Sequence, residues 1–136
     1  MGRSVGTHPY AAAVVYVDVE EYSDYSDGWA DFLLDLAGVL QHYYDDLEFA
    51  DGWHGREGRI LLENDRAEVV VYTYSNLASV NLVAKEGYDE EELEDNENWC
   101  AERVEEFRQL LHANFDCLEL VGRFSNGEAV YRRSEA

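Results

Sequence analysis

The sequence predicts an α+β protein: a two-layer sandwich in which a largely antiparallel sheet carries two helices on one face. Two stretches repeat apolar residues with helical periodicity, and the segments around them are rich in Val, Leu and Tyr and are separated by turn signals. In chain order these segments read β-α-β-β-β-α-β-β. Because 136 residues are typical of one domain, we expect residues 1–136 to form a single domain, with residues 1–10 as a loose N-terminal tail.

The first strand and the first helix are expected directly after this tail. Residues 11–19 are rich in Val and Tyr, which favours a strand. Asp24, Ser26 and Asp27 then offer N-cap oxygens. The apolar residues that follow recur at the spacing of one helical face, and they are Trp29, Phe32, Leu33, Leu36, Leu40, Tyr43 and Leu47. We therefore predict a helix over residues 27–47.

A meander of three strands is predicted next. Residues 51–58 are rich in Gly and are typical of a turn. Strands are then expected at 59–63 and 67–74, with residues 64–65 (Asn-Asp) as the hairpin turn. Another turn, Ser-Asn, precedes a third strand over 77–86, in which apolar and polar side chains alternate.

The C-terminal part is expected to contain an acidic loop, a second helix and a hairpin. Residues 87–96 form the acidic loop, and the helix runs over 97–113. Its inward-facing residues are Cys100, Val104, Phe107 and Leu111. Residues 117–124 and 128–132 form the last hairpin, because Asn-Gly between them is a strong turn signal.

The charge of the chain is unusual in its sign and in its distribution. Thirty acidic residues against ten basic ones give a formal net charge of -20. Residues 18–51, here called the first acidic block, hold 11 acidic and no basic residues. Residues 86–106, the second acidic block, hold 11 acidic residues and one base, Arg103. The rest of the chain is nearly neutral. This distribution argues against direct binding of nucleic acid or of an anionic membrane, both of which attract basic residues.

Motifs for catalysis or for cofactors are not found in the sequence. It contains no nucleotide-binding loop, no zinc-protease motif and no EF-hand pattern. A helix between Cys100 and Cys117 would hold them about 25 Å apart, too far for a disulfide. No apolar stretch is long enough to span a membrane. We therefore expect a cytoplasmic protein that is not an enzyme, with no catalytic residues, no cofactor and no metal.

The acidic blocks have no evident role in folding. Asp27, Asp31 and Asp35 recur every four residues, so their carboxylates stack along one face of the first helix. Like charges at this spacing destabilise a helix. The predicted end of that helix adds further acids where negative charge opposes the macrodipole. We therefore interpret the blocks as a surface for a basic partner.

The candidate partner-binding residues are acids of both blocks and nearby aromatics. Each carboxylate would accept charge-assisted hydrogen bonds from Arg and Lys of the partner. In the first block they are Asp24, Asp27, Asp31, Asp35, Asp45, Asp46 and Glu48. In the second block they are Glu90, Glu91, Glu92, Glu94, Asp95 and Glu97. The aromatics are Tyr22, Tyr25 and Tyr88.

In charge, size and aromatic content the chain resembles DNA-mimic inhibitors, such as antirestriction and anti-CRISPR proteins of phages and mobile elements. It is similar in the same respects to the acidic immunity proteins that neutralise nuclease toxins. No sequence motif carries this resemblance. It implies a partner whose basic surface binds nucleic acid, such as a nuclease or a defence complex.

The sequence is also compatible with two other interpretations. One is adaptation to high salt, which a low pI, nine Arg against one Lys and a single Ile would fit. The uneven distribution of charge counts against it, because a solvation strategy should decorate all faces. The other is a small enzyme or regulator with an unreadable site, on which the acidic loop is simply a solvated surface.

Overall fold

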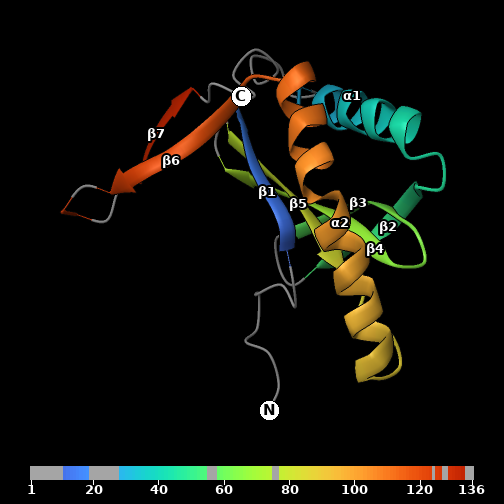
Figure 1. The fold of residues 1–136 in the computed structure, drawn as a ribbon. Coiled ribbons are helices and arrows are strands. Elements are labelled where there is room, and N and C mark those ends of the chain that lie inside the picture. Colours follow the sequence, from blue (N-terminus) through green and yellow to red (C-terminus); the bar gives the residue numbers. More distant parts are fainter. Residues whose placement is uncertain are drawn as a thin grey trace.

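One layer of the structure is an antiparallel sheet and the other is a pair of helices on one face of it (Figure 1). The computed structural model describes residues 11–18, 28–54, 58–74, 77–123, 125–126 and 129–133. The described elements are β1 (Ala11–Asp18), α1 (Gly28–Tyr43), β2 (Glu48–His54), β3 (Gly58–Glu63), β4 (Ala67–Tyr74), β5 (Leu77–Ala84), α2 (Glu90–Asn114), β6 (Cys117–Arg123) and β7 (Ala129–Arg133). The predicted α+β fold class is confirmed.

The sheet places β1 near its centre. Among the described residues its strand order is β2-β3-β4-β5-β1-β6-β7, and each neighbouring pair is antiparallel. β5 pairs with β1 over nearly its whole length, whereas β6 pairs with β1 at Leu118 and Cys117. The hairpin of β6 and β7 consequently projects away from the helices (Figure 1).

The core lies between the helices and one face of the sheet. α1 buries Phe32, Leu36 and Leu40, which follow one another at intervals of four residues. α2 buries residues that were predicted to face inward, Cys100, Phe107 and Leu111, and the fourth, Val104, packs against the same cluster. The sheet supplies alternate residues of β4 and β5, such as Val69, Val71, Val80 and Leu82. Both helices are thus held on the sheet by a single hydrophobic cluster.

The structure contains a strand, β2, where the sequence predicted a helix end and a turn. α1 ends at Tyr43 rather than at residue 47, and the chain turns through Asp45 and Asp46. Leu47 is buried, as its place in the helical pattern predicted, but it lies beyond the helix. The side chain of Gln41 donates a 3.1 Å hydrogen bond to the carbonyl of Leu47. Residues 48–54 then pair with β3, with an irregularity between Phe49 and Gly52. The predicted order of the other elements is retained.

The predicted acidic loop over residues 87–96 is also wrong for most of its length, because α2 already begins at Glu90. Gly87 has a φ of 72°, in the left-handed region that favours glycine, and turns the chain into the helix. Asp89 is the N-cap residue. The buried side chain of Asn96 donates a 2.9 Å hydrogen bond to the carbonyl of Lys85, which fixes this part of α2 to the end of β5.

Several predicted features fall outside the described residues. They are the N-terminal tail over 1–10, the turn at 75–76 and the N-cap candidates Asp24, Ser26 and Asp27. Within the described ranges, no helix is long and apolar enough to cross a membrane.

Candidate functional site

The first acidic block is divided between α1 and the segment that follows it. Asp31 and Asp35 lie on α1 and are exposed. Asp45 and Asp46 form the turn after α1, and Glu48 begins β2; all three are exposed. Asp45 and Asp46 were predicted to lie in the helix and Glu48 directly at its end, but α1 ends at Tyr43, before all three. Four other predicted partner-binding residues lie outside the described ranges, namely Tyr22, Asp24, Tyr25 and Asp27.

The second acidic block forms the N-terminal half of α2. Glu90, Glu91 and Glu92 occupy the first turn, where the helix macrodipole favours negative charge. Asp89 accepts a 2.8 Å hydrogen bond from the backbone N–H of Glu92, and the Glu92 carboxylate accepts one of 2.8 Å from the N–H of Tyr88. Glu92 therefore has a role within the chain itself, which its selection as a partner-binding residue did not foresee.

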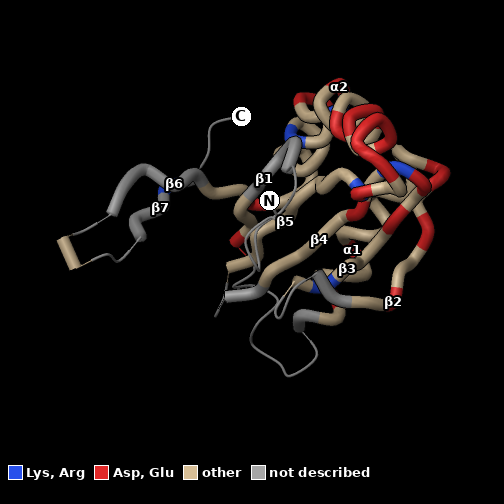
Figure 2. Tube along the Cα trace, turned by 90° about the horizontal axis from the view of Figure 1, so that it is seen from below, with Lys and Arg blue, Asp and Glu red and all other residues tan. Residues whose placement is uncertain are grey.

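Beyond the first turn, the predicted partner-binding acids of α2 are exposed or half-buried. Its buried residues begin at Asn96. Glu94 and Asp95 are exposed, Glu97 is half-buried, and Tyr88 just before the helix is 98% exposed. Acidic positions gather on α2 and on the neighbouring end of the fold near β2 and the β3–β4 turn (Figure 2). The projecting hairpin lies on the other side of the molecule.

Two surface hollows lie between α2 and the β3–β4 turn, and they share Arg66 and Trp99. The larger, of about 490 Å³, is lined in addition by Asp95, Asn98, Glu102 and Arg103 of α2. The smaller, of about 370 Å³, is lined in addition by Asp46, Glu48, Asn64 and Asp65. We refer to the two hollows together as the Trp99 groove.

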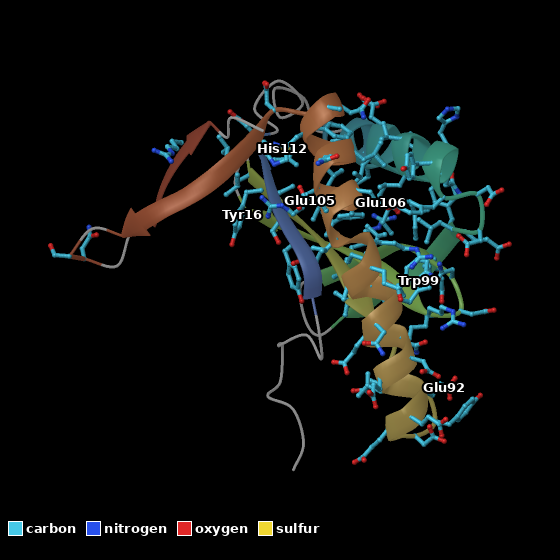
Figure 3. All side chains as sticks on the ribbon, viewed as in Figure 1. Tyr16, Glu92, Trp99, Glu105, Glu106 and His112 are labelled. Atoms are coloured by element: carbon cyan, nitrogen blue, oxygen red, sulfur yellow. The ribbon has the colours of Figure 1, made fainter. Side chains whose placement is uncertain are left out.

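The Trp99 groove brings parts of the two acidic blocks together. Asp46 and Glu48 of the first block line one end, and Asp95 of the second block lines the other. Trp99 lies on the side of α2 that faces β2 and the β3–β4 turn (Figure 3). The exposed residues Asp31 and Asp35 line neither hollow. The groove therefore joins the second block to the residues that follow α1, rather than to the row on α1.

A guanidinium group is already seated on the indole of this groove. The Cζ atom of Arg103 lies 4.1 Å from the centre of the Trp99 ring, within the range of a cation–π interaction. Its Nη1 donates a 2.9 Å hydrogen bond to the carbonyl of Trp99. Trp99 also packs against the hydrophobic core. The ring is thus held in place from below and is covered in part by Arg103.

Glu106 fixes the end of α1 against α2. It accepts hydrogen bonds from the hydroxyl groups of Tyr44, at 3.0 Å, and Tyr43, at 3.4 Å. Burial, together with the Glu106 carboxylate, raises the pKa of Tyr44 well above its usual range, so this hydroxyl remains a donor. The turn that carries Asp46 directly follows these tyrosines. Its position relative to α2 is consequently set by side-chain contacts between the helices.

Several residues of the groove were not selected from the sequence. Glu102 lies seven residues after Asp95, on the same helical face. The sequence did not reveal this pairing, because the predicted helix began at residue 97 and left Asp95 in a loop. Asp65 and Arg66 belong to the β3–β4 turn. Their approach to the first block depends on strand β2, which was not predicted.

The described residues show no arrangement for metal binding or thiol chemistry. Within these ranges no three His, Cys, Asp or Glu side chains are grouped to hold a metal ion. Cys100 and Cys117 are free and buried. Burial raises the pKa of the Cys100 thiol to about 12 and that of Cys117 to about 11. Both are therefore protonated at neutral pH, whereas the thiolate is the form that attacks or binds metals.

No protein-family model matches the chain, and no curated protein or solved structure matches it either. The features of the chain that bear on its function are the geometry and charge of the Trp99 groove and the surrounding acidic surface.

Proposed function

We propose that this protein is a small, non-enzymatic inhibitor that binds the basic, nucleic-acid-binding surface of a partner protein by mimicking the charge of DNA. The partner is a nuclease or a nucleic-acid-binding defence complex, as with antirestriction, anti-CRISPR or nuclease-immunity proteins, and the protein acts in the cytoplasm. It does not bind nucleic acid directly, needs no cofactor and does not enter a membrane. The observation that carries this proposal is the Trp99 groove, which the acids of both blocks line.

The composition of the groove supports a cationic partner. Five carboxylates line it, those of Asp46, Glu48, Asp65, Asp95 and Glu102, against two guanidinium groups. Carboxylates accept strong charge-assisted hydrogen bonds from Arg and Lys. The surrounding acidic surface would accelerate encounter with a basic partner. Trp is also among the residues that most often anchor interfaces.

The test compares two variants of equal charge. The groove variant carries Asp46→Asn, Glu48→Gln, Asp95→Asn and Glu102→Gln. The control variant carries Asp51→Asn, Glu86→Gln, Glu105→Gln and Asp116→Asn. These replace exposed acids that line neither hollow and were not selected as partner-binding residues. Each variant and the wild type are immobilised and incubated with a native lysate at low and at high salt. Captured proteins are then identified, purified and tested for DNA binding and for competition by the wild-type protein.

The expected result is a DNA-binding protein that the wild type and the control retain at low salt. The groove variant should bind it at least about 30-fold more weakly, because loss of close interfacial charge pairs typically costs 2 kcal/mol or more. Captured proteins that do not bind DNA, or equal affinity of the two variants for the captured protein, would contradict the proposal.

Adaptation to high salt is distinguished by a separate measurement. A halophilic protein should lose its fold at low ionic strength, because its acidic surface needs screening cations. Thermal melts from 10 mM to 2 M KCl decide this question. On the inhibitor proposal the protein remains folded at low salt, and unfolding there would favour halophilic adaptation instead.

A further inference from the structure

The ladder between β1 and β6 is short, and it leaves two strand edges open. Within the described ranges β5 pairs with β1 along the whole strand, whereas β6 pairs with it only at Leu118 and Cys117. Beyond this point β6 diverges from β1, and the β6–β7 hairpin projects from the molecule in both views (Figure 1, Figure 2). On their facing edges, residues 11–15 of β1 and 119–123 of β6 consequently have no described strand beside them.

Strand edges of this kind favour pairing with a further strand. A row of backbone N–H and C=O groups without a neighbouring strand is a template for another strand. A hairpin of two strands is marginally stable in water unless another element packs against it. In the described sheet, β7 is the last strand and has β6 as its single neighbour. The hairpin therefore needs a strand beside β6.

The two open edges match each other in direction and register. Tyr16 pairs with Leu118 in an antiparallel ladder, and continuing this register places residues 11–15 opposite residues 119–123. Within one chain the two segments diverge (Figure 1). A second copy of the chain presents the same two edges, so β6 of each copy can pair with β1 of the other. Such an exchange is isologous, and it closes as a two-fold dimer.

The charge of the hairpin favours a second copy over a basic partner. Its described residues hold one acid, Glu119, against three bases, Arg123, Arg132 and Arg133, in a chain with a formal net charge of -20. The acidic positions of α2 and of the region near β2 lie on the other side of the molecule (Figure 2). Two copies that meet through their hairpins therefore keep these acidic surfaces apart, which limits the repulsion between them.

We propose that the protein forms a two-fold dimer by exchanging its β6–β7 hairpins. Residues 119–123 of each copy pair with residues 11–15 of the other, and each sheet gains a continuous ladder beside β1. This inference does not rest on the proposed function, because no acid of the Trp99 groove takes part in the exchange.

The first test measures the mass of the full-length protein by light scattering over a range of concentrations and KCl. At micromolar concentrations the mass should be that of two chains. Adding KCl should strengthen the dimer, because salt screens the repulsion between two acidic chains, whereas it should weaken binding to a basic partner. The mass of one chain at every concentration and salt would overturn the proposal, and so would a mass above that of two chains.

The second test traps the exchanged strands with a disulfide. Val14→Cys and Leu120→Cys lie opposite each other in the continued register, where antiparallel partners have Cα atoms about 4.5–5.5 Å apart, within reach of a disulfide. The two variants are produced separately, mixed in urea, refolded together and oxidised. A disulfide should then link one chain of each kind. The native cysteines Cys100 and Cys117 are buried, and burial raises their thiol pKa values, so they react slowly.

A control and a double variant complete this test. Val14→Cys mixed with Leu34→Cys should give no linked pair, because Leu34 is an exposed residue of α1, outside the two edges. A chain that carries both Val14→Cys and Leu120→Cys should form disulfides between chains. A disulfide within one chain would show that the hairpin closes on its own β1, and it would overturn the exchange. If the cysteine variants do not fold in thermal melts, the mass of the wild-type protein decides the result.

Discussion

The two acidic blocks carry almost the same charge, but their densest runs of acids lie differently relative to their helices. The second block begins α2, where Glu90, Glu91 and Glu92 lie in the first turn. The first block continues past the end of α1, where Asp45 and Asp46 form the turn. A helix macrodipole favours negative charge at its N-terminus and disfavours it at its C-terminus. Acids thus stabilise the start of α2, whereas those in the turn after α1 oppose the macrodipole of that helix, although Asp31 in the first turn of α1 is favourably placed.

This difference changes the weight of each block as evidence for a partner. Part of the second block is explained by folding, because Asp89 and Glu92 cap α2 through hydrogen bonds. The acids after α1 cap no helix: Asp45 and Glu48 are exposed, and Asp46 accepts a 3.2 Å hydrogen bond from the side chain of Asn64. The strongest indication of a binding surface is therefore the segment after α1, together with the acids of α2 that lie beyond its first turn and line the Trp99 groove.

The acids near the ends of α1 and α2 keep fixed positions only if the same core holds both helices firmly. Phe32 of α1 and Phe107 of α2 are both fully buried. Replacing either with Ala should reduce the free energy of unfolding by about 3–5 kcal/mol, through lost burial and the cavity left behind. Urea unfolding of Phe32→Ala and Phe107→Ala measures both values. A cost below 1 kcal/mol for Phe32→Ala alone would mean that α1 is loosely attached, and the groove walls would then not be fixed.

Two glycine substitutions, one before α2 and one within α1, should change the stability of the protein in opposite directions. Gly87 precedes α2 with a φ of 72°, and an added Cβ would lie 2.6 Å from Cγ of Glu92. Gly87→Ala should therefore destabilise the protein by about 1–2 kcal/mol. Gly38 lies within α1, and an added Cβ would meet nothing within 4 Å. Gly38→Ala should stabilise by about 0.5–1 kcal/mol. Thermal melts of both variants check the two signs, and stabilisation by Gly87→Ala would refute the described turn.

The sequence predicted the fold class and the inward residues of α2 because both depend on local periodicity. It did not predict β2, because Glu48, Asp51 and Gly52 have low strand propensity and Leu47 continues the helical pattern of α1. Pairing with β3 creates this strand, and such tertiary pairing cannot be read from a local window.

The sequence showed which segments carry the excess of acidic residues, but it did not predict how these residues are arranged in space. The start of α2 was missed because a dense run of acids resembled a solvated loop, although Asp89 and Glu92 have the spacing of a capping pair. The groove around Trp99 depends on β2 and on the β3–β4 turn approaching α2. Without that long-range contact, sequence patterns could not select Asp65, Arg66 or Glu102.

Replacing the N-cap residue of α2 should change the stability of the protein by a smaller amount. Asp89→Ala removes the acceptor of the Glu92 N–H bond and should cost about 1 kcal/mol of stability, as is typical for an N-cap residue. Asp89→Asn retains an acceptor oxygen and should change stability much less. Chemical unfolding of the two variants makes this comparison. Equal losses would show that the charge of Asp89, and not its hydrogen bond, supports the helix.

The smallest effect is expected at the C-terminal end of α1. Asp45 is exposed and lies just beyond the C-terminus of α1, where its negative charge faces the negative end of the macrodipole. Asp45→Asn should therefore stabilise the protein, by about 0.3–1 kcal/mol at low ionic strength. Because salt screens exposed charges, the gain should disappear in 1 M KCl. Glu91→Gln is the matched control in the first turn of α2, and it should be slightly destabilising under the same conditions. If both substitutions stabilised equally, general repulsion among the acids would outweigh the helix ends, and the distinction between the two blocks would be lost.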